Sequence, residues 1–341
     1  MAELMDKYLS MQRNRGKAAS TLANERSTIR KLAAHWDGQR RAPSRLDAEA
    51  LEDFVYGPGG LSERTPNADT FNRELVHIRR FVKWLIDRRE VQPGTHEVLA
   101  PRPRTPKQFV RITLLQIQHM IDTCDDPYER WIIALASQTL GRESELLRLR
   151  FAHFHEDTMT IDWYRPKTRD RDSMFMTDAL ASELRRWKLT LQESVGRPAT
   201  GEWFAVPRRW KLGEGAGYAY RQNENVAVYS PDQPRKAKLA PIVQRHVTRI
   251  TGIPAAELKG QGVHIIRRSG ARALYDRLVE ERHPDPLRVV MAVLGHANPQ
   301  VTERYLGIKA DRERRNALLA GSRLLSVDTS SVTRLESKRS G

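Results

Sequence analysis

Hydrophobic positions recur at helical spacing through the first ninety residues. The clearest stripe comprises Phe71, Leu75, Ile78, Val82 and Leu85. Its steps of four and three residues place all five side chains on one helix face. A similar run covers 22–36 and ends before Gly38, and weaker helical patterns cover 5–12 and 48–56. Residues 1–91 are therefore predicted to form a small helical bundle.

A proline-rich, basic segment separates this bundle from the rest of the chain. It covers 92–108 and contains Pro93, Pro101, Pro103 and Pro106. Proline lacks a backbone donor and favours extended backbone, so the segment is predicted to be an interdomain linker. A second domain is then expected over 109–325, followed by a polar tail, 326–341, that we expect to be disordered.

The second domain has a mixed pattern. Helices are predicted at 114–121, 128–139, 180–191, 241–250, 265–279 and 287–294. Polar and apolar residues alternate over 158–164 and 173–176, which predicts two strands joined by a charged turn over 167–172. Residues 200–238 are interpreted as an irregular loop. The predicted fold class is mainly α with a small antiparallel β-sheet.

Composition adds a class of partner to this picture. The chain has 58 Lys and Arg against 42 Asp and Glu, a formal charge of +16. With a pI near 10.2, this favours nucleic acid over an anionic membrane. No apolar run is long enough to span a membrane, and residues 1–10 lack the apolar core of a signal peptide. The single Cys124 excludes an internal disulfide framework, and without a CxxC pair there is no zinc-finger spacing.

Four local clusters could carry chemistry. They contain Arg142 with Glu145, Lys167, His264 with Arg267, and His296 with Tyr305. Each has a plain structural interpretation by itself: a surface ion pair, a solvated turn lysine, a capping histidine beside a solvated arginine, and a core aromatic. At a helix start, however, an imidazole and a guanidinium three residues apart also make a natural phosphate grip.

The order of the clusters resembles that of the tyrosine recombinases, the family of phage integrases and of Cre-like and Xer-like recombinases. The matching elements are Gly-Arg-Glu-Ser-Glu-Leu at 141–146, His-Ile-Ile-Arg at 264–267, Leu-Gly-His at 294–296 and Thr-Glu-Arg-Tyr at 302–305. Two features depart from the family pattern. The first element lacks an apolar residue between Gly141 and Arg142, and the 200–238 segment is longer.

This resemblance implies a role for each candidate. Arg142 and Arg267 would neutralise the scissile phosphate, and Tyr305 would attack it to form a 3′-phosphotyrosine. The supporting roles fall to His264 as base, Lys167 as proton donor to the leaving 5′-oxygen, His296 as a phosphate donor, and Glu145 as the residue that holds the cations. The resemblance requires no cofactor and no metal.

The resemblance also implies partners. We expect the core-binding bundle and the catalytic domain to form a C-shaped clamp on duplex DNA. Candidate DNA-binding residues are Arg73, Arg80, Lys83, Arg102, Arg104 and Lys107. We expect a monomer in solution and a homo-tetramer on two recombination sites, with accessory DNA-bending proteins as possible further partners. The expected location is cytoplasmic and nucleoid-associated, in a prokaryotic or phage-encoded protein. The helix expected at 312–325 would dock either on its own domain or on a neighbouring protomer.

Other functions stay open at this point. A type IB topoisomerase or a telomere resolvase shares the same pocket, and a non-catalytic DNA-binding protein would explain the charge alone. A metal-dependent nuclease, suggested by His153, His155, Glu156 and Asp157, is the least favoured. The DNA target, and the choice among integration, excision and resolution, cannot be predicted from the sequence.

Overall fold

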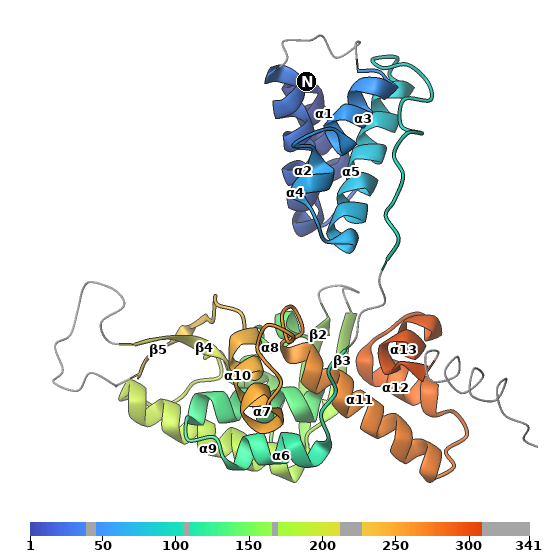
Figure 1. Ribbon diagram of the computed structural model, residues 1–341. Helices are drawn as coiled ribbons and strands as arrows, with labels where there is room; N and C mark the ends of the chain where they lie inside the picture. The colour runs from blue at the N-terminus through green and yellow to red at the C-terminus, as the bar shows by residue number, and fades with distance from the viewer. Residues whose placement is uncertain (39–45, 105–108, 166–169, 212–226, 309–341) are drawn as a thin grey trace, which may run out of the picture. The chain divides into compact units, whose positions relative to one another are not determined.

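The computed structural model describes residues 1–38, 46–104, 109–165, 170–211 and 227–308 (Figure 1). Contacts divide the chain into two compact units, 1–108 and 109–341. None of the described helices is both long and apolar in the way a membrane span requires.

The N-terminal unit is a helical bundle, as predicted. Its helices are α1 (Ala2–Asn14), α2 (Ala19–Gly38), α3 (Ala48–Tyr56), α4 (Leu61–Arg64) and α5 (Ala68–Asp87). The side chain of Asn67 caps α5 by accepting a hydrogen bond from the Thr70 amide. The predicted apolar stripe of α5 is buried along its whole length and packs on α1 and α2. The short α4 was not predicted, since four residues carry too little periodicity.

Part of the proline-rich segment packs on this bundle. Leu99 is buried in the bundle core. The Arg102 guanidinium lies over the Phe71 ring and donates hydrogen bonds to the carbonyls of Ser62, Thr65 and Pro66. Arg102 therefore has a packing role within the N-terminal unit.

The C-terminal unit is built mainly from helices. They are α6 (Leu114–Asp122), α7 (Pro127–Thr139), α8 (Glu143–Leu146), α9 (Asp178–Val195), α10 (Ala240–Thr251), α11 (Val263–Glu280), α12 (Pro286–Leu294) and α13 (Pro299–Leu306), with a 3₁₀ turn at Phe151–His153. The main core contains the buried indoles of Trp131 and Trp187, whose N–H groups both donate to the Ala205 carbonyl. A smaller core joins α11, α12 and α13 through Ala271, Val290 and Leu306.

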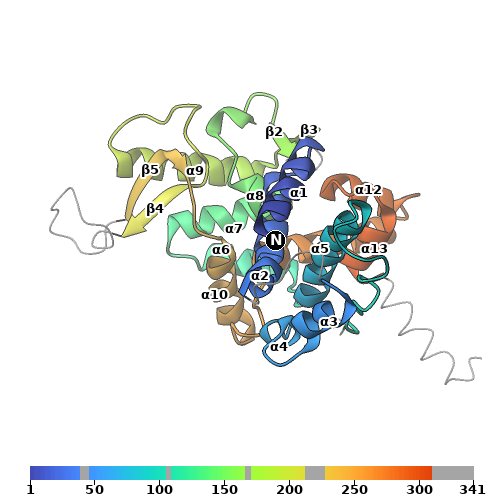
Figure 2. The ribbon, with the colours of Figure 1, turned by 90° about the horizontal axis from the view of Figure 1, so that it is seen from above.

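Two antiparallel sheets complete this unit (Figures 1 and 2). The first has the order β1 (Phe154–His155), β2 (Thr160–Arg165), β3 (Asp170–Phe175). The predicted turn over 167–172 is too long, because β3 already begins at Asp170 and pairs with Arg165. The alternating residues Ile161 and Trp163 are buried, as their pattern predicts.

The second sheet corrects the prediction for 200–238. Strands β4 (Pro207–Lys211) and β5 (Ala227–Pro234) pair with each other, so an irregular loop is wrong for these residues. Their basic residues and prolines hide the alternation that marks a strand. The strands are stabilised by tertiary contacts instead, including the Tyr229 ring against Trp187 of α9. Residues 212–226 lie outside the described part of the chain.

Candidate active site

Arg142 and Glu145 form an ion pair in which the carboxylate is buried and the guanidinium is partly exposed. Helix α7 ends at Thr139, the following Leu140 turns the chain with a φ of 49°, and Arg142 is then the N-cap residue of α8. The Glu145 carboxylate, 2% exposed, accepts hydrogen bonds of 2.7 Å from both the Arg142 amide and its guanidinium. The interpretation as an ordinary surface ion pair is therefore wrong. Gly141 allows this turn, because a Cβ there would lie 2.5 Å from the Trp163 ring.

Arg267 links three segments around this pair. It lies in α11, is 1% exposed, and donates to the carbonyls of Leu140 and Leu294, the latter at 2.6 Å. Its guanidinium is 3.9 Å from the second Glu145 oxygen. Burial lowers the pKa of Arg267 to about 10, so this side chain stays cationic at neutral pH. The plain structural interpretation, in which Arg267 is a solvated arginine beside a capping histidine, is therefore wrong: Arg267 is buried and held by hydrogen bonds.

His264 lies three residues earlier on α11, and its side chain stays accessible. Desolvation lowers the pKa of His264, and the cations of Arg267, Arg268 and Arg142 lower it further. The imidazole is therefore neutral at pH 7 and able to accept a proton.

The Leu-Gly-His element joins α12 to α13. Gly295 ends α12 at a φ of 58°, and a Cβ there would collide with the guanidinium of Arg165. Nδ1 of His296 lies 3.0 Å from the Thr302 hydroxyl, which orients the ring. That ring meets the Tyr305 ring edge to face, with centroids 5.5 Å apart.

Tyr305 is carried by α13. The predicted start of this helix is confirmed, since Asn298 caps it and Pro299 is its first residue. The Tyr305 hydroxyl is buried and makes no hydrogen bond of standard geometry to the described residues. Burial raises the pKa of Tyr305, whereas the cations of Arg267, Arg268 and Arg142 act in the opposite direction. The three cations thus lie close enough to the phenol to favour its ionised form, while burial keeps its pKa above the ordinary value.

One predicted catalytic residue lies outside the described part of the chain. Lys167 belongs to the segment between the end of β2 at Arg165 and the start of β3 at Asp170. The other six candidates (Arg142, Glu145, His264, Arg267, His296 and Tyr305) come together at the adjoining ends of α7, α8, α11, α12 and α13.

Two further arginines were missed. Arg165 is 8% exposed, lies 3.0 Å from Asp172 and donates to the Val293 carbonyl. Its signal was available, because it continues the buried alternation of Ile161 and Trp163. Arg268 is also buried and contacts the Tyr305 ring.

The described residues contain a single group that could hold a metal ion, and it is separate from this cluster. Ligand atoms of Cys124, Glu129 and His246 lie within 4.8 Å of one another. Guanidiniums of Arg245 and Arg249 contact Glu129 and His246, which opposes a further positive charge there. His153, His155, Glu156 and Asp157 do not form such a group.

The predicted DNA-binding residues differ in their surroundings. Arg73 and Lys83 are exposed on α5. Arg80 lies 3.6 Å from Glu25, and Arg104 lies 3.6 Å from Asp69. Lys107 falls outside the described residues, and Arg102 packs within the bundle as described above.

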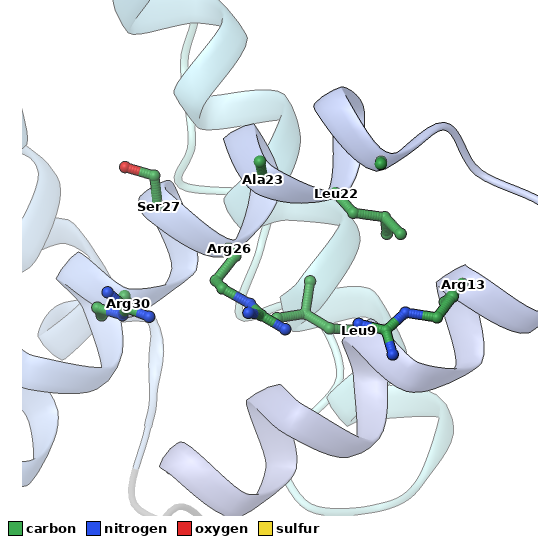
Figure 3. Close-up of a pocket in the computed structure, with 8 residues that line it drawn as sticks. Leu9, Arg13, Leu22, Ala23, Arg26, Ser27 and Arg30 are labelled. Atoms are coloured by element: carbon green, nitrogen blue, oxygen red, sulfur yellow. The ribbon is translucent and has the colours of Figure 1, made fainter.

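A pocket between α1 and α2 carries cations that the sequence pattern did not single out. Its lining combines apolar Leu9 and Leu22 with Arg13, Arg26 and Arg30. Arg13 and Arg26 extend toward the space between the two helices (Figure 3). All three arginines are exposed, and none has an acidic partner within the described ranges.

Comparison with known proteins gives one curated relative. The Syntrophus aciditrophicus (strain SB) protein called tyrosine recombinase XerC is 22% identical over 315 residues, which are 90% of this chain and 92% of that protein. No protein-family model matches the chain.

Solved structures share the fold. A lambda integrase (75–356) dimer bound to a COC′ core site has a TM-score of 0.57 at 15% identity, covering 90% of this chain and 95% of that one. The Tn1549 transposon integrase in complex with a circular intermediate DNA has a TM-score of 0.56 at 14% identity, and the match covers 91% of this chain and 99% of that one. XerH recombinase bound to a palindromic difH substrate has a TM-score of 0.55 at 15% identity, and the match covers 93% of this chain and 84% of that one.

These likenesses confirm the predicted fold class, a mainly helical chain with small antiparallel sheets. The resemblance inferred from the four sequence elements agrees with them. The chain is thus similar in sequence to a tyrosine recombinase over nine-tenths of its length, and it shares its fold with solved integrases.

Proposed function

We propose that this chain is a site-specific recombinase that cuts and rejoins duplex DNA through a 3′-phosphotyrosine. One observation carries the proposal: the Tyr305 phenol lies close enough to the guanidiniums of partly exposed Arg142 and buried Arg267 for both cations to act on its pKa. A phenol with a pKa near 10 is a poor nucleophile at neutral pH. Burial raises the pKa of Tyr305 further and the cations oppose that rise, so a base is needed to take the proton, and His264 is the candidate.

The two guanidiniums would bind the scissile phosphate. Planar N–H donors match phosphate oxygens, and fixed cations stabilise the charge that grows on those oxygens in the transition state. Glu145 and the carbonyls of Leu140 and Leu294 hold both arginines before DNA arrives. This preorganisation is what a metal-free phosphoryl transfer requires.

The covalent step is a displacement at phosphorus. The Tyr305 oxygen forms a bond to phosphorus, its proton passes to neutral His264, and the bond from phosphorus to the 5′-oxygen breaks. By family resemblance, Lys167 protonates that leaving oxygen and His296 donates a hydrogen bond to the phosphate. The phosphotyrosine keeps the phosphodiester energy, so a 5′-hydroxyl from a partner strand can reverse the step without ATP.

The assembly follows from the relatives. Lambda integrase has been solved as a tetramer bound to a Holliday junction, and its fold matches this chain with a TM-score of 0.54. We therefore infer that four copies act on two DNA sites. A type IB topoisomerase would instead relax supercoiled DNA and yield no recombinant product.

Covalent adduct formation in EDTA tests this function. Because the DNA target is not known from the sequence, the substrate for this test is a library of nicked fragments of the source genome. We expect adducts that survive denaturation and form at the same rate with and without the chelator, because guanidiniums supply the charge that metals supply elsewhere. Loss of adducts in EDTA and their return with magnesium would contradict the proposal.

The α1–α2 pocket is proposed to bind DNA phosphates. A plot of log affinity against log salt concentration has a slope of about −0.9 for each phosphate that the protein neutralises. Changing Arg13, Arg26 or Arg30 singly to Gln should therefore reduce the magnitude of this slope by about 0.9, because one phosphate contact is lost. Lys7→Gln is the matched control, because Lys7 lies on α1 and is paired with Glu3 at 2.7 Å. Equal slopes for the arginine variants and the control would exclude this surface from the interface.

A further inference from the structure

Arg268 lies against the ring of the proposed nucleophile. Its guanidinium carbon is 5.2 Å from the Tyr305 ring centroid and 3.8 Å from that of Phe109. The residue is 6% exposed. A guanidinium against an aromatic face is attracted by the ring electrons, and more strongly when water is excluded.

The charge of Arg268 is poorly satisfied where it lies. Its Nε and Nη1 atoms are buried, and neither has a hydrogen-bond partner in the part of the chain that the structure describes. Nor does any described carboxylate lie within ion-pair distance of it. Burial lowers the pKa of Arg268, and Arg111 acts in the same direction, whereas Tyr305 opposes both. A buried cation with unused donors is stabilised when a negative charge appears beside it.

The other charged groups around Tyr305 are already engaged. Arg267 of α11 donates to two carbonyls, and Arg142 at the start of α8 is paired with Glu145. His296, which follows α12, touches the ring and lies within hydrogen-bond distance of Thr302. Arg268 is therefore the cation beside Tyr305 whose Nε and Nη1 donors have no partner among the described residues.

We propose that Arg268 is a positioning residue, which holds the Tyr305 ring and favours its ionised form. This rests on the proposed function, in which Tyr305 is the nucleophile. When the proton leaves for His264, the negative charge spreads into the ring that Arg268 contacts. Arg268 itself forms and breaks no bond. Phe109 supports the guanidinium from the segment before α6.

The test is the pH profile of adduct formation by the full chain on nicked cognate DNA. In Arg268→Gln the alkaline rise in rate should move up by about one pH unit, a roughly tenfold loss at neutral pH that recovers at high pH. Arg268→Lys should recover part of the shift. Arg277→Gln is the control on the same helix, since Arg277 is 65% exposed and paired with Glu281.

A merely structural role would lower the rate equally at every pH, and that result would overturn the proposal. A second readout needs no DNA. The phenolate absorbance of the wild-type chain minus that of Tyr305→Phe gives the titration of Tyr305 alone. Arg268→Gln should move this curve to higher pH, and an unmoved curve would overturn the proposal even if the chain forms no adduct. Absence of adducts in the wild type would count against the proposed function instead.

Discussion

A Tyr305→Phe chain should bind its DNA site as tightly as the wild type and form no covalent adduct. The hydroxyl is the atom that would bond to phosphorus, and no other atom of Phe can replace it. Because that hydroxyl makes no standard hydrogen bond to the described residues, its removal should cost the fold little. Denaturing gels on a nicked site measure the adduct, and gel shifts on the same DNA measure binding.

Tyr275→Phe is the matched control for this change. Tyr275 is a second partly buried tyrosine in the small core that also contains Tyr305. Its variant should form adducts at the wild-type rate. Persistence of the adduct in Tyr305→Phe would show that another residue is the nucleophile.

Arg267→Gln should reduce the rate of adduct formation by about 10²- to 10³-fold. Loss of one preorganised donor to a developing charge typically has this effect. The variant should also lose about 1–3 kcal/mol of unfolding free energy, because the buried carbonyls of Leu140 and Leu294 lose charged donors. Single-turnover rates with saturating DNA measure the first effect, and urea denaturation measures the second.

Two variants make this result specific. Arg267→Lys keeps the charge but not the planar donors, so its rate should fall between those of Gln and the wild type. Arg277→Gln removes an exposed charge from the same helix and should change neither quantity appreciably. A wild-type rate of adduct formation in folded Arg267→Gln would show that Arg267 does not stabilise the charge on the scissile phosphate.

Local signals explain which parts of the fold were predictable. The stripe of α5 and the Asn298–Pro299 start of α13 depend on neighbours within one or two helical turns, and both are confirmed. The strands β4 and β5 have no such local pattern. They are stabilised by pairing with each other and by aromatic contacts to α9 and α7, which only the folded chain provides.

The same distinction applies to the site. The three-residue spacing of Arg142 and Glu145 predicted their contact. It did not predict that the Glu145 carboxylate is buried, which fixes the position of the Arg142 guanidinium. Arg267 and Leu140 are 127 positions apart, and no periodicity predicts that hydrogen bond. The ordered family elements, not composition or spacing, identified the set. Arg165 and Arg268 lie outside those assigned roles: the alternation of β2 could have indicated that Arg165 is buried, whereas the burial of Arg268 and its contact with the Tyr305 ring emerge only from the folded chain.

Mapping the covalent linkage tests the central claim most directly. The full chain would be incubated with nicked cognate DNA, the trapped adduct digested with protease and nuclease, and the modified peptide sequenced by mass spectrometry. We predict a nucleotide joined through its 3′-phosphate to Tyr305, with a free 5′-hydroxyl on the released strand. A 5′-phosphate linkage, or attachment at any other residue, would contradict the account.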